Sequence, residues 1–443
     1  MLFDGSDSAF CHVAVYHSAH CLRGRGRDAG LSGARFAAMF VQTASLDGAG
    51  PRQNSFMSNN LCLVSHDLHP YGAQRLALML TREWTLSHKR HVEIVSCGGG
   101  SLSPAARRLA PVTALGEHWR NERRSLRNIM PQLRRAGVNA AFTNTVIAGK
   151  YCKDLREAGF ATIALIHEMP SLIATEGLLS CLYAAHEFAH CVIYPHAAVA
   201  NAIDKAFPNL PNWDRVQILP QGIAAVNAYR DSRDLARDSV RKMLGIAADA
   251  KLVIAVGTGD RRKGVDLFLD TALAMPVSDT PVHFLWVGPL NDADIAQWSQ
   301  GHGGRSVQSV PNTHWLGYQD STAIFHAAAD AFVLCSREDP FPFVVLESLS
   351  AGVPVVAFAG SGGGADLVLR GCGINVSEVT GVAMARTLNV YLADDTLRAE
   401  QGRRGMAIVD SEYRFDRYAE TLLKLADSIA DQSQRRPAVG ASE

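Results

Sequence analysis

The stretch LCSREDPFPFVVLESLSAGVPVVAFAGSGGGADLV, residues 334–368, places a strand, a polar turn, a helix, a second strand and a glycine-rich turn in direct succession. A helix is expected from about Phe341 to Ala351, because Pro342 falls in its first turn, where a missing N–H costs nothing. The run VPVVAF, residues 353–358, then predicts the next strand. This order is the repeating unit of a parallel sheet with helices on its faces.

The same alternation continues over most of the chain, in two series that break after the PQG triplet at 220–222. It predicts an α/β protein with two Rossmann-like, doubly wound domains that face each other across a cleft. We expect the domains at 57–225 and 226–443, the second with a terminal helix. The main predicted strands are 61–66, 91–97, 137–145, 161–168 and 190–195 in the first series, and 251–259, 282–288, 313–318, 330–336 and 353–358 in the second.

The bulk composition is typical of a soluble globular protein. Of 443 residues, 47% are hydrophobic and 19% are charged, and the formal net charge is zero. A balanced charge argues against nucleic acid as a partner. The nine cysteines are scattered without a C-x-x-C pair, which favours reduced thiols in the cytoplasm. No apolar run reaches the roughly 18 residues that a membrane-spanning helix needs.

The first 56 residues differ from the rest, because they are rich in Gly, Ala and Arg and show no sustained periodicity. They lack the apolar core of a signal peptide. We expect either a disordered extension, 1–56, or a chain that truly begins at Met57.

Two carboxylates and a run of glycines mark residues 334–368 as a candidate binding site. Asp339 lies at the start of the predicted helix, and helical spacing puts Glu347 on an apolar face, where an unpaired carboxylate is costly. The backbone N–H groups of Gly362, Gly363 and Gly364 could hold phosphate oxygens. Such a set suits a nucleotide sugar, since a carboxylate can accept hydrogen bonds from both ribose hydroxyls. On residue type alone, an N-cap and a satisfied buried acid are equally good explanations.

The segment SREDPFPFVVLESLSAGVPVVAF, 336–358, resembles the signature of the family 4 retaining glycosyltransferases of GT-B fold, in which seven residues separate two acids. In that register Asp339 takes the first acidic position, which in the family contacts the donor sugar. Glu347 takes the second, which holds the ribose. The family more often has Glu at the first position. The likeness covers scattered blocks of 61–376.

The block VGTGDRRKGVDLFLDTA looks like the strand, loop and helix that hold the diphosphate in this family. Lys263 occupies the lysine position, and Arg262 or Arg261 could clamp phosphate, because a guanidinium can bind it through two hydrogen bonds. Many family members have Arg directly after the glycine of the strand, whereas here Thr258 follows Gly257.

In the first half, VSHDLHPYGAQRLALML is similar to the opening strand and glycine loop of the family, where Gly72 and Ala73 would let the backbone approach the diphosphate. The segment IHEMPSLI places His167 at a strand end, like the family's histidine beside the donor sugar. Asn144 and Thr145 are further candidates at the neighbouring strand end.

The resemblance implies a hexosyltransferase-like enzyme that moves a sugar from a nucleotide diphosphate sugar to a glycan or a lipid-linked acceptor, with retention, in cell-surface polysaccharide synthesis. It implies no metal and no other cofactor, with Asp339, His167 and Lys263 in catalytic roles. The expected location is the cytoplasm or the inner face of the membrane. An epimerase or hydrolase of the same fold, or an inactive nucleotide-binding domain, stays open as an alternative.

The segment HEFAHCVIYPH resembles a zinc protease motif through His186, His190 and His196. That motif requires a glycine seven residues after the first histidine, where this chain has Ile193, a poor residue for positive φ. We therefore predict a helix running into a strand, and no zinc site.

The segment HWRNERRSLRNIMPQLRRAG, 118–137, carries six arginines against one glutamate. It predicts a basic amphipathic helix, either an ordinary exposed helix or one that binds anionic lipid.

Overall fold

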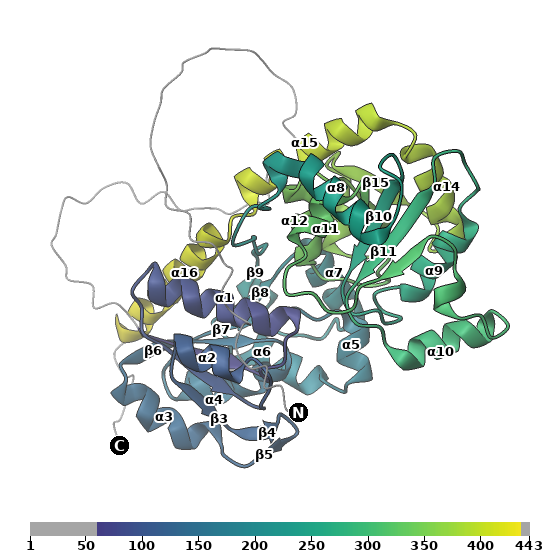
Figure 1. Ribbon diagram of the computed structural model, residues 1–443. Coiled ribbons are helices and arrows are strands. Elements are labelled where there is room, and N and C mark those ends of the chain that lie inside the picture. Colours follow the sequence, from purple (N-terminus) through teal and green to yellow (C-terminus); the bar gives the residue numbers. More distant parts are fainter. Residues whose placement is uncertain (1–59, 436–443) are drawn as a thin grey trace, which may run out of the picture. The chain divides into compact units, whose positions relative to one another are not determined.

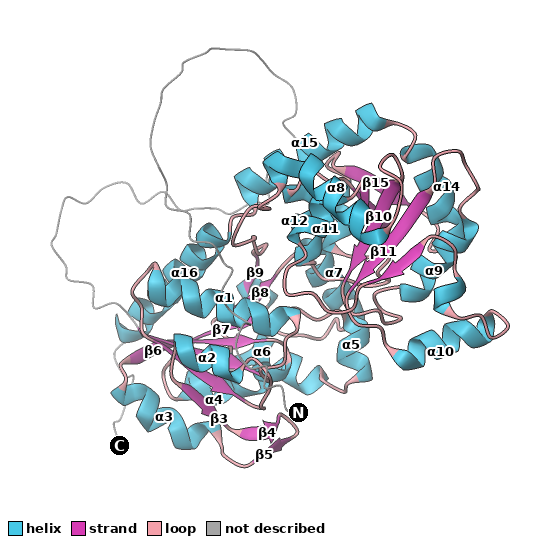
Figure 2. Cartoon of the chain, in the orientation of Figure 1, coloured by secondary structure: helices cyan, strands magenta, loops and turns pink. Residues whose placement is uncertain are grey.

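The computed structural model describes residues 60–435, which fall within one compact unit. The expected extension at 1–56 and the proposed start at Met57 lie outside the described residues. The described chain forms two parallel sheets flanked by helices (Figures 1 and 2).

The first sheet has seven strands in the order β3-β2-β1-β6-β7-β8-β9, and all its pairs are parallel. Every residue of β2 and β7 is buried, as expected for central strands of a parallel sheet with both faces covered. The strands are β1 Asn60–Ser65, β2 Val92–Ser96, β3 Val112–Ala114, β6 Val138–Asn144, β7 Ala161–Leu165, β8 Cys191–Tyr194 and β9 Val216–Ile218. The helices between them are α1 Gly72–Leu86, α2 Ser103–Leu109, α3 Leu126–Arg135, α4 Cys152–Glu157, α5 Pro170–Thr175, α6 Leu179–Phe188 and α7 Ala197–Ala206.

The second sheet has six parallel strands in the order β12-β11-β10-β13-β14-β15. The strands are β10 Lys251–Val256, β11 Val282–Val287, β12 Thr313–Trp315, β13 Ala331–Leu334, β14 Val355–Phe358 and β15 Gly373–Val376. The helices are α8 Arg233–Leu244, α9 Val265–Ala274, α10 Asp292–Gly301, α11 Ala323–Ala328, α12 Phe343–Ser350, α13 Gly363–Val368, α14 Gly381–Tyr391, α15 Asp395–Glu412 and α16 Phe415–Arg435.

Both sheets reverse their strand order at one point. The chain first builds outward from β1 through β2 to β3, and then returns to place β6 on the other side of β1. The second sheet repeats this pattern with β13 beside β10. Loops leave the carboxyl ends of the two central strands in opposite directions at such a switch point, and the crevice between them is where open α/β sheets bind ligands. The topology therefore directs attention to the residues after β1, β6, β10 and β13.

The predicted fold class, two doubly wound parallel sheets, is confirmed. Three edge strands were not predicted: β3, β9 and β15. Each has three or four residues, most of which are only partly buried or exposed, so none shows the apolar run of the central strands.

The boundary 226–443 assumed that the terminal helix α16 packs with the second sheet, but its buried residues lie in the core of the first sheet. Phe415, Tyr418 and Leu422 are buried in the same hydrophobic core as β1, β6 and β7 of the first sheet. Trp84 of α1 donates a hydrogen bond from Nε1 to the carbonyl of Ala419 at 3.0 Å. The helix has an apolar stripe that completes the core of the first sheet, and this pairing between distant segments decides its place.

The chain crosses between the two sheets twice, and the crossings lie side by side. Ile223 and Arg414 form an isolated parallel bridge, in which the N–H of Ile223 donates to Tyr413 O at 2.9 Å. A Cβ atom on Gly222 would lie 2.4 Å from Tyr413 O, so a glycine is required where the two crossings touch.

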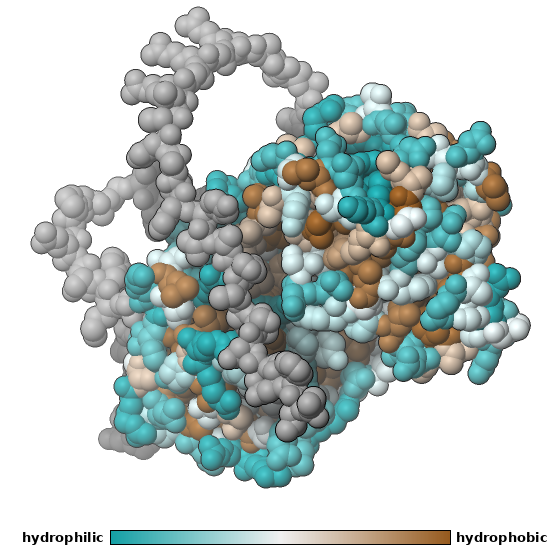
Figure 3. Space-filling view, in the orientation of Figure 1, coloured by the Kyte–Doolittle hydropathy of each residue, from teal (hydrophilic) through white to brown (hydrophobic). Residues whose placement is uncertain are grey.

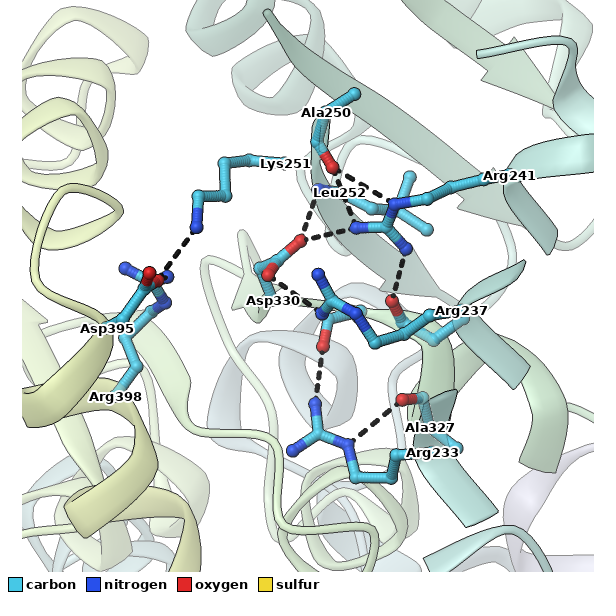
Figure 4. A network of polar contacts seen from close by, with 12 residues as sticks. Arg233, Arg237, Arg241, Ala250, Lys251, Leu252, Ala327, Asp330, Asp395 and Arg398 are labelled. Carbon is cyan, nitrogen blue, oxygen red and sulfur yellow. Dashed lines mark hydrogen bonds and ion pairs between the residues drawn. The ribbon is translucent and has the colours of Figure 1, made fainter. Parts of the chain in front are cut away.

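A buried ionic network lies at the amino ends of β10 and β13, opposite to the switch-point loops (Figure 4). Asp330 Oδ2 accepts from Arg241 Nη2 at 2.8 Å and from the N–H of Leu252 at 2.7 Å, while Oδ1 accepts from Arg237 at 2.9 Å. Arg233 donates to the carbonyls of Ala327 and Ala329. These bonds join α8 to the end of α11.

The segment 118–137 is not the single helix predicted from the sequence; only its second part is helical. Its first part contains most of a small hairpin, with β4 Gly116–His118 and β5 Asn121–Glu122, and α3 begins at Leu126. Within residues 60–435 no helix is both long and apolar enough to cross a membrane. On the face seen in Figure 3, small hydrophobic groups are interspersed among hydrophilic residues.

Candidate functional site

An ion pair occupies the switch point of the second sheet. Asp339 follows β13 and is almost fully buried, and its Oδ2 pairs with Lys263 Nζ from the loop after β10. Ser336 Oγ donates to the same oxygen at 3.3 Å. A buried carboxylate is costly unless it is paired, so this contact fixes both side chains. The two residues that the sequence placed in separate motifs are thus in direct contact.

The neighbouring Glu338 has a different environment. It is half-buried, and its Oε2 accepts from Ser171 Oγ of α5, which belongs to the first sheet. Of the two adjacent acids, Asp339 therefore faces Lys263, whereas Glu338 faces the other half of the molecule.

The glycines Gly362–Gly364 fit closely against the loop that carries Asp339. A Cβ atom on Gly362 would lie 1.8 Å from Asp339 O, and one on Gly363 would lie 2.7 Å from Pro340 O. The N–H of Gly363 donates to Pro340 O at 3.1 Å. Close packing alone thus requires glycine at these two positions, and the proposed phosphate contact of the segment stays a prediction.

Gly257 and Arg262 lie beside the same ion pair. A Cβ atom on Gly257, whose φ is +144°, would contact Lys263 Cε at 3.8 Å, so the lysine side chain passes over this glycine. Arg262 Nη1 donates to Glu338 O at 3.2 Å. The Arg261 guanidinium lies instead 3.7 Å from Asp266. Of the two arginines, Arg262 is therefore next to the acidic loop, on the same side as Lys263.

Glu347 of α12 is more exposed than expected. Its side chain is 41% exposed, and its Oε2 lies 3.5 Å from His326 Nε2 and accepts from Thr322 Oγ1 at 3.4 Å. The expectation of a buried acid is wrong, because α12 buries the face of Val345, Leu346 and Leu349 and leaves Glu347 beside it.

In the first sheet, the buried side-chain amide of Asn144 links two other predicted residues, Ala73 and His167. Asn144, at the end of β6, donates from Nδ2 to Ala73 O at 2.8 Å, and its Oδ1 lies 3.0 Å from His167 Nε2. Burial, with a smaller contribution from His66, lowers the pKa of His167 from 6.5 to about 4. His167 is therefore neutral at pH 7. Gly72 begins α1 and is exposed, and a Cβ atom there would meet nothing within 4 Å.

Thr145 and Glu168 complete this cluster. Thr145 has a φ of +92°, which is strained for a β-branched residue, and its Oγ1 lies 3.0 Å from His66 Nδ1. Glu168 Oε2 accepts from the N–H groups of Val146 and His167, both at 3.0 Å. Burial nevertheless raises the pKa of Glu168 from 4.5 to about 7.

The three histidines of the apparent zinc motif do not share a site. His186 contacts Pro211 O at 3.0 Å and the Tyr194 hydroxyl at 2.7 Å. His190 accepts from the N–H of Thr162, and His196 caps α7 by accepting from Ala198 at 3.1 Å. Within the described part of the chain no group of three His, Cys, Asp or Glu residues could hold a metal ion. The predicted passage from helix to strand is confirmed by α6 and β8.

Two further contacts join the first half of the described chain to the second. His196 of the first half stacks on Phe341 of the second at 5.7 Å, and Arg75 donates to the Tyr318 hydroxyl at 3.0 Å. The sequence did not single out His326 or Ser336. Each is an isolated polar residue in an apolar or turn segment, and only the fold brings it to the candidate site.

The comparison with protein families gives a match over one third of the chain. Residues 250–394 match the family described as glycosyl transferases group 1. This segment contains β10 to β15 and all the predicted site residues of the second sheet.

Curated relatives match over similar stretches. A lipopolysaccharide core biosynthesis glycosyltransferase, LpsE of Rhizobium meliloti, is 28% identical over 42% of this chain and 53% of its own length. The lipopolysaccharide glucosyltransferase WaaG of Escherichia coli is 28% identical over 37% of this chain and 43% of its own. The matched stretches thus span about half the length of these relatives.

Solved structures match over nearly the whole described chain. HepE of Anabaena in complex with UDP and glucose superposes with a TM-score of 0.70 at 18% identity, covering 84% of this chain and all of its own. The crystal structure of WaaG gives 0.61 at 17% identity, with 85% and 100% coverage. Likeness at this level of identity concerns the fold. Residues 250–394 thus match the model of the glycosyl transferases group 1 family, and the two parallel sheets of the chain form the GT-B fold.

Proposed function

We propose that this protein is a glycosyltransferase that moves a sugar from a nucleotide diphosphate sugar to an acceptor hydroxyl with retention at the anomeric carbon. The names of LpsE and WaaG support a role in the synthesis of a lipopolysaccharide or another cell-surface glycan. The complex of HepE with UDP and glucose makes a UDP-sugar the first donor to test.

The observation that carries the proposal is the ion pair of Lys263 with Asp339 at the switch point of the second sheet. A donor diphosphate placed there would compete with Asp339 for the ammonium group of Lys263. Arg262, held against Glu338 O, supplies a second positive charge nearby. Where negative charge develops during a reaction, preorganised positive charge of this kind usually lowers the barrier more than any other single effect.

In this proposal the bond between the anomeric carbon and the diphosphate oxygen breaks while Lys263 and Arg262 stabilise the charge on that oxygen. The acceptor hydroxyl attacks on the same face and gives its proton to the departing phosphate oxygen, so retention needs no separate base. Asp339 and neutral His167 would orient the sugar by accepting hydrogen bonds from its hydroxyls. Glu347 would hold the ribose.

The first experiment is a thermal-shift panel with UDP-, GDP- and ADP-sugars, because a ligand that binds the native state raises its stability. The donor selected in this way is then incubated with and without glycan acceptors, and the anomeric configuration of the product is read by proton NMR. We expect net transfer with retention. Conversion of most of the donor in the absence of acceptor would favour the epimerase or hydrolase, and binding without turnover would favour the inactive domain.

A matched pair of variants tests the position of the acid. Asp339→Asn loses the charge that pairs with Lys263, and we expect its kcat to fall about 100-fold, the scale for removing one preorganised polar group. Glu338→Gln changes the adjacent residue, which contacts Ser171, and it should stay within about twofold of the wild type because a surface contact of this kind contributes little. The reverse result would exchange the roles of the two acids.

A peripheral place at the inner membrane face also stays a prediction. Several arginines of 118–137 are already paired with acids, among them Arg120 with Glu176 at 2.7 Å and Arg127 with Asp154 at 2.6 Å. Binding to anionic liposomes that is lost at high salt would support it, since exposed charges are screened by salt.

A further inference from the structure

His326 stands out among the buried polar residues because both of its ring nitrogens lack a well-formed hydrogen bond within the described residues. It belongs to α11 and is 0% exposed. A buried polar group left without a partner is destabilising, and most buried groups in proteins have one. An unpaired imidazole in this position therefore requires an explanation.

The nearest charged group to this ring is the carboxylate of Glu347. His326 Nε2 lies 3.5 Å from Glu347 Oε2, slightly beyond a good hydrogen bond, and Thr322 Oγ1 approaches the same oxygen at 3.4 Å. Both contacts are made to Oε2, from the side of α11. Among the described residues neither group contacts the other oxygen, Oε1, and the Glu347 side chain is 41% exposed.

The helix that carries His326 is anchored at both ends. Two arginines of α8 bind the carbonyls at the end of α11: Arg233 binds Ala327 and Ala329, and Arg241 binds Ala328 (Figure 4). The start of the helix is fixed by Asn227 Nδ2, which donates to Ala323 O at 2.8 Å. His326 therefore stands on an anchored helix, beside the partly exposed side chain of Glu347.

We propose that His326 is a positioning residue for Glu347. The Nε2–H of His326 holds Oε2 of Glu347, so that the carboxylate presents Oε1 to the two hydroxyls of a ribose. The proposal rests on the proposed function, in which Glu347 binds the ribose. A carboxylate held in one rotamer before binding loses less entropy when the ligand arrives. His326 therefore lowers the stability of the free protein and raises its affinity for a ribonucleotide.

The chain contains a matched control. His186 is also 0% exposed, but both of its ring nitrogens are partnered, by Pro211 O and the Tyr194 hydroxyl. The two buried histidines thus differ in hydrogen bonding, and the same substitution should affect them in opposite ways.

The experiment compares His326→Leu, His326→Gln and His186→Leu by two measurements. The first is the melting temperature. The second is the ratio of the Kd for a 2′-deoxynucleoside diphosphate to that for its ribose form, using whichever of UDP, GDP and ADP the wild type binds most tightly. We expect His326→Leu to melt at or above the wild-type temperature while its affinity for the ribose form falls roughly fivefold to tenfold, the scale of one lost ordinary hydrogen bond. Affinity for the deoxy form should change much less.

His326→Gln keeps an N–H donor and should recover part of the preference for ribose. His186→Leu should melt at a lower temperature and keep the wild-type ratio. If His326→Leu melts lower and retains the full preference for ribose, His326 is an ordinary core residue and the inference is overturned alone. If the wild type binds none of the three diphosphates, the proposed function fails and takes the inference with it.

Discussion

The direction of one hydrogen bond determines what His167 can do. Asn144 gives its Nδ2 hydrogens to a carbonyl, that of Ala73, so its Oδ1 is the atom that faces His167. His167 must then carry its proton on Nε2 and present Nδ1 as an acceptor. Among residues 60–435 no group donates a hydrogen bond to Nδ1. A neutral acceptor suits a sugar hydroxyl.

The pH dependence of stability should report this neutral histidine. The pKa of His167 is about 4 in the folded state and 6.5 as the ordinary value, so the unfolded state binds the proton more readily. The stability that neutral His167 contributes is present above pH 6.5 and is lost as the pH falls toward 4. We expect His167→Gln to lose less stability than the wild type between pH 7 and pH 5 in urea denaturation.

The comparison of the two proteins isolates His167 from its titrating neighbours. The pKa of Glu168 is raised to about 7, so its contribution is lost as the pH rises, in the opposite direction, but it is present in both proteins. Equal slopes for the wild type and His167→Gln would show that His167 is already protonated or exposed.

Among the elements, β10 and β13 carry a structural ionic network at one end and the candidate site at the other. The ionic network around Asp330 lies at the amino ends of β10 and β13, while the ion pair of Lys263 with Asp339 follows their carboxyl ends. Both depend on the register of the same two strands. A buried network at one end can therefore hold the strands that position the candidate site at the other.

Asp330→Ala should be strongly destabilising. Arg241 is buried and would lose its carboxylate, and breaking a buried pair in this way costs about 3–5 kcal/mol. Glu117→Ala, which removes the partner of Arg123, is the control: that carboxylate is 79% exposed and the change should cost less than about 1 kcal/mol. Guanidinium denaturation measures both, and similar losses in the two variants would contradict the assignment of the network as buried.

At the scale of the whole molecule, sequence patterns predicted what depends on neighbouring residues and missed what depends on distant ones. The apolar runs of β1 and β10 predicted buried parallel strands, and the resemblance around Asp339 and Lys263 named two residues that the fold places in contact. The packing of α16 on the first sheet and the role of His326 depend on segments far apart in the chain. No local pattern contains that information.

The placement of α16 can be tested with two neighbouring residues. Leu422 is fully buried in the core of the first sheet, so Leu422→Ala should cost about 2–5 kcal/mol in unfolding free energy. Lys424, whose side chain is 72% exposed, provides the control, and Lys424→Ala should stay within about 0.5 kcal/mol. Hydrogen exchange should show the loss in β1 and β6. A change confined to the second sheet would contradict the packing.

The return of α16 to the first sheet also determines the order of events during synthesis. A ribosome releases the strands of the first sheet early, yet the helix that covers part of their apolar surface emerges only after the whole second sheet. Until then the nascent chain exposes this hydrophobic surface, and such surfaces bind chaperones and promote aggregation. The half of the molecule that is translated first is therefore the last to be completed, and a fragment that stops near residue 225 should precipitate unless a peptide of α16 is supplied with it.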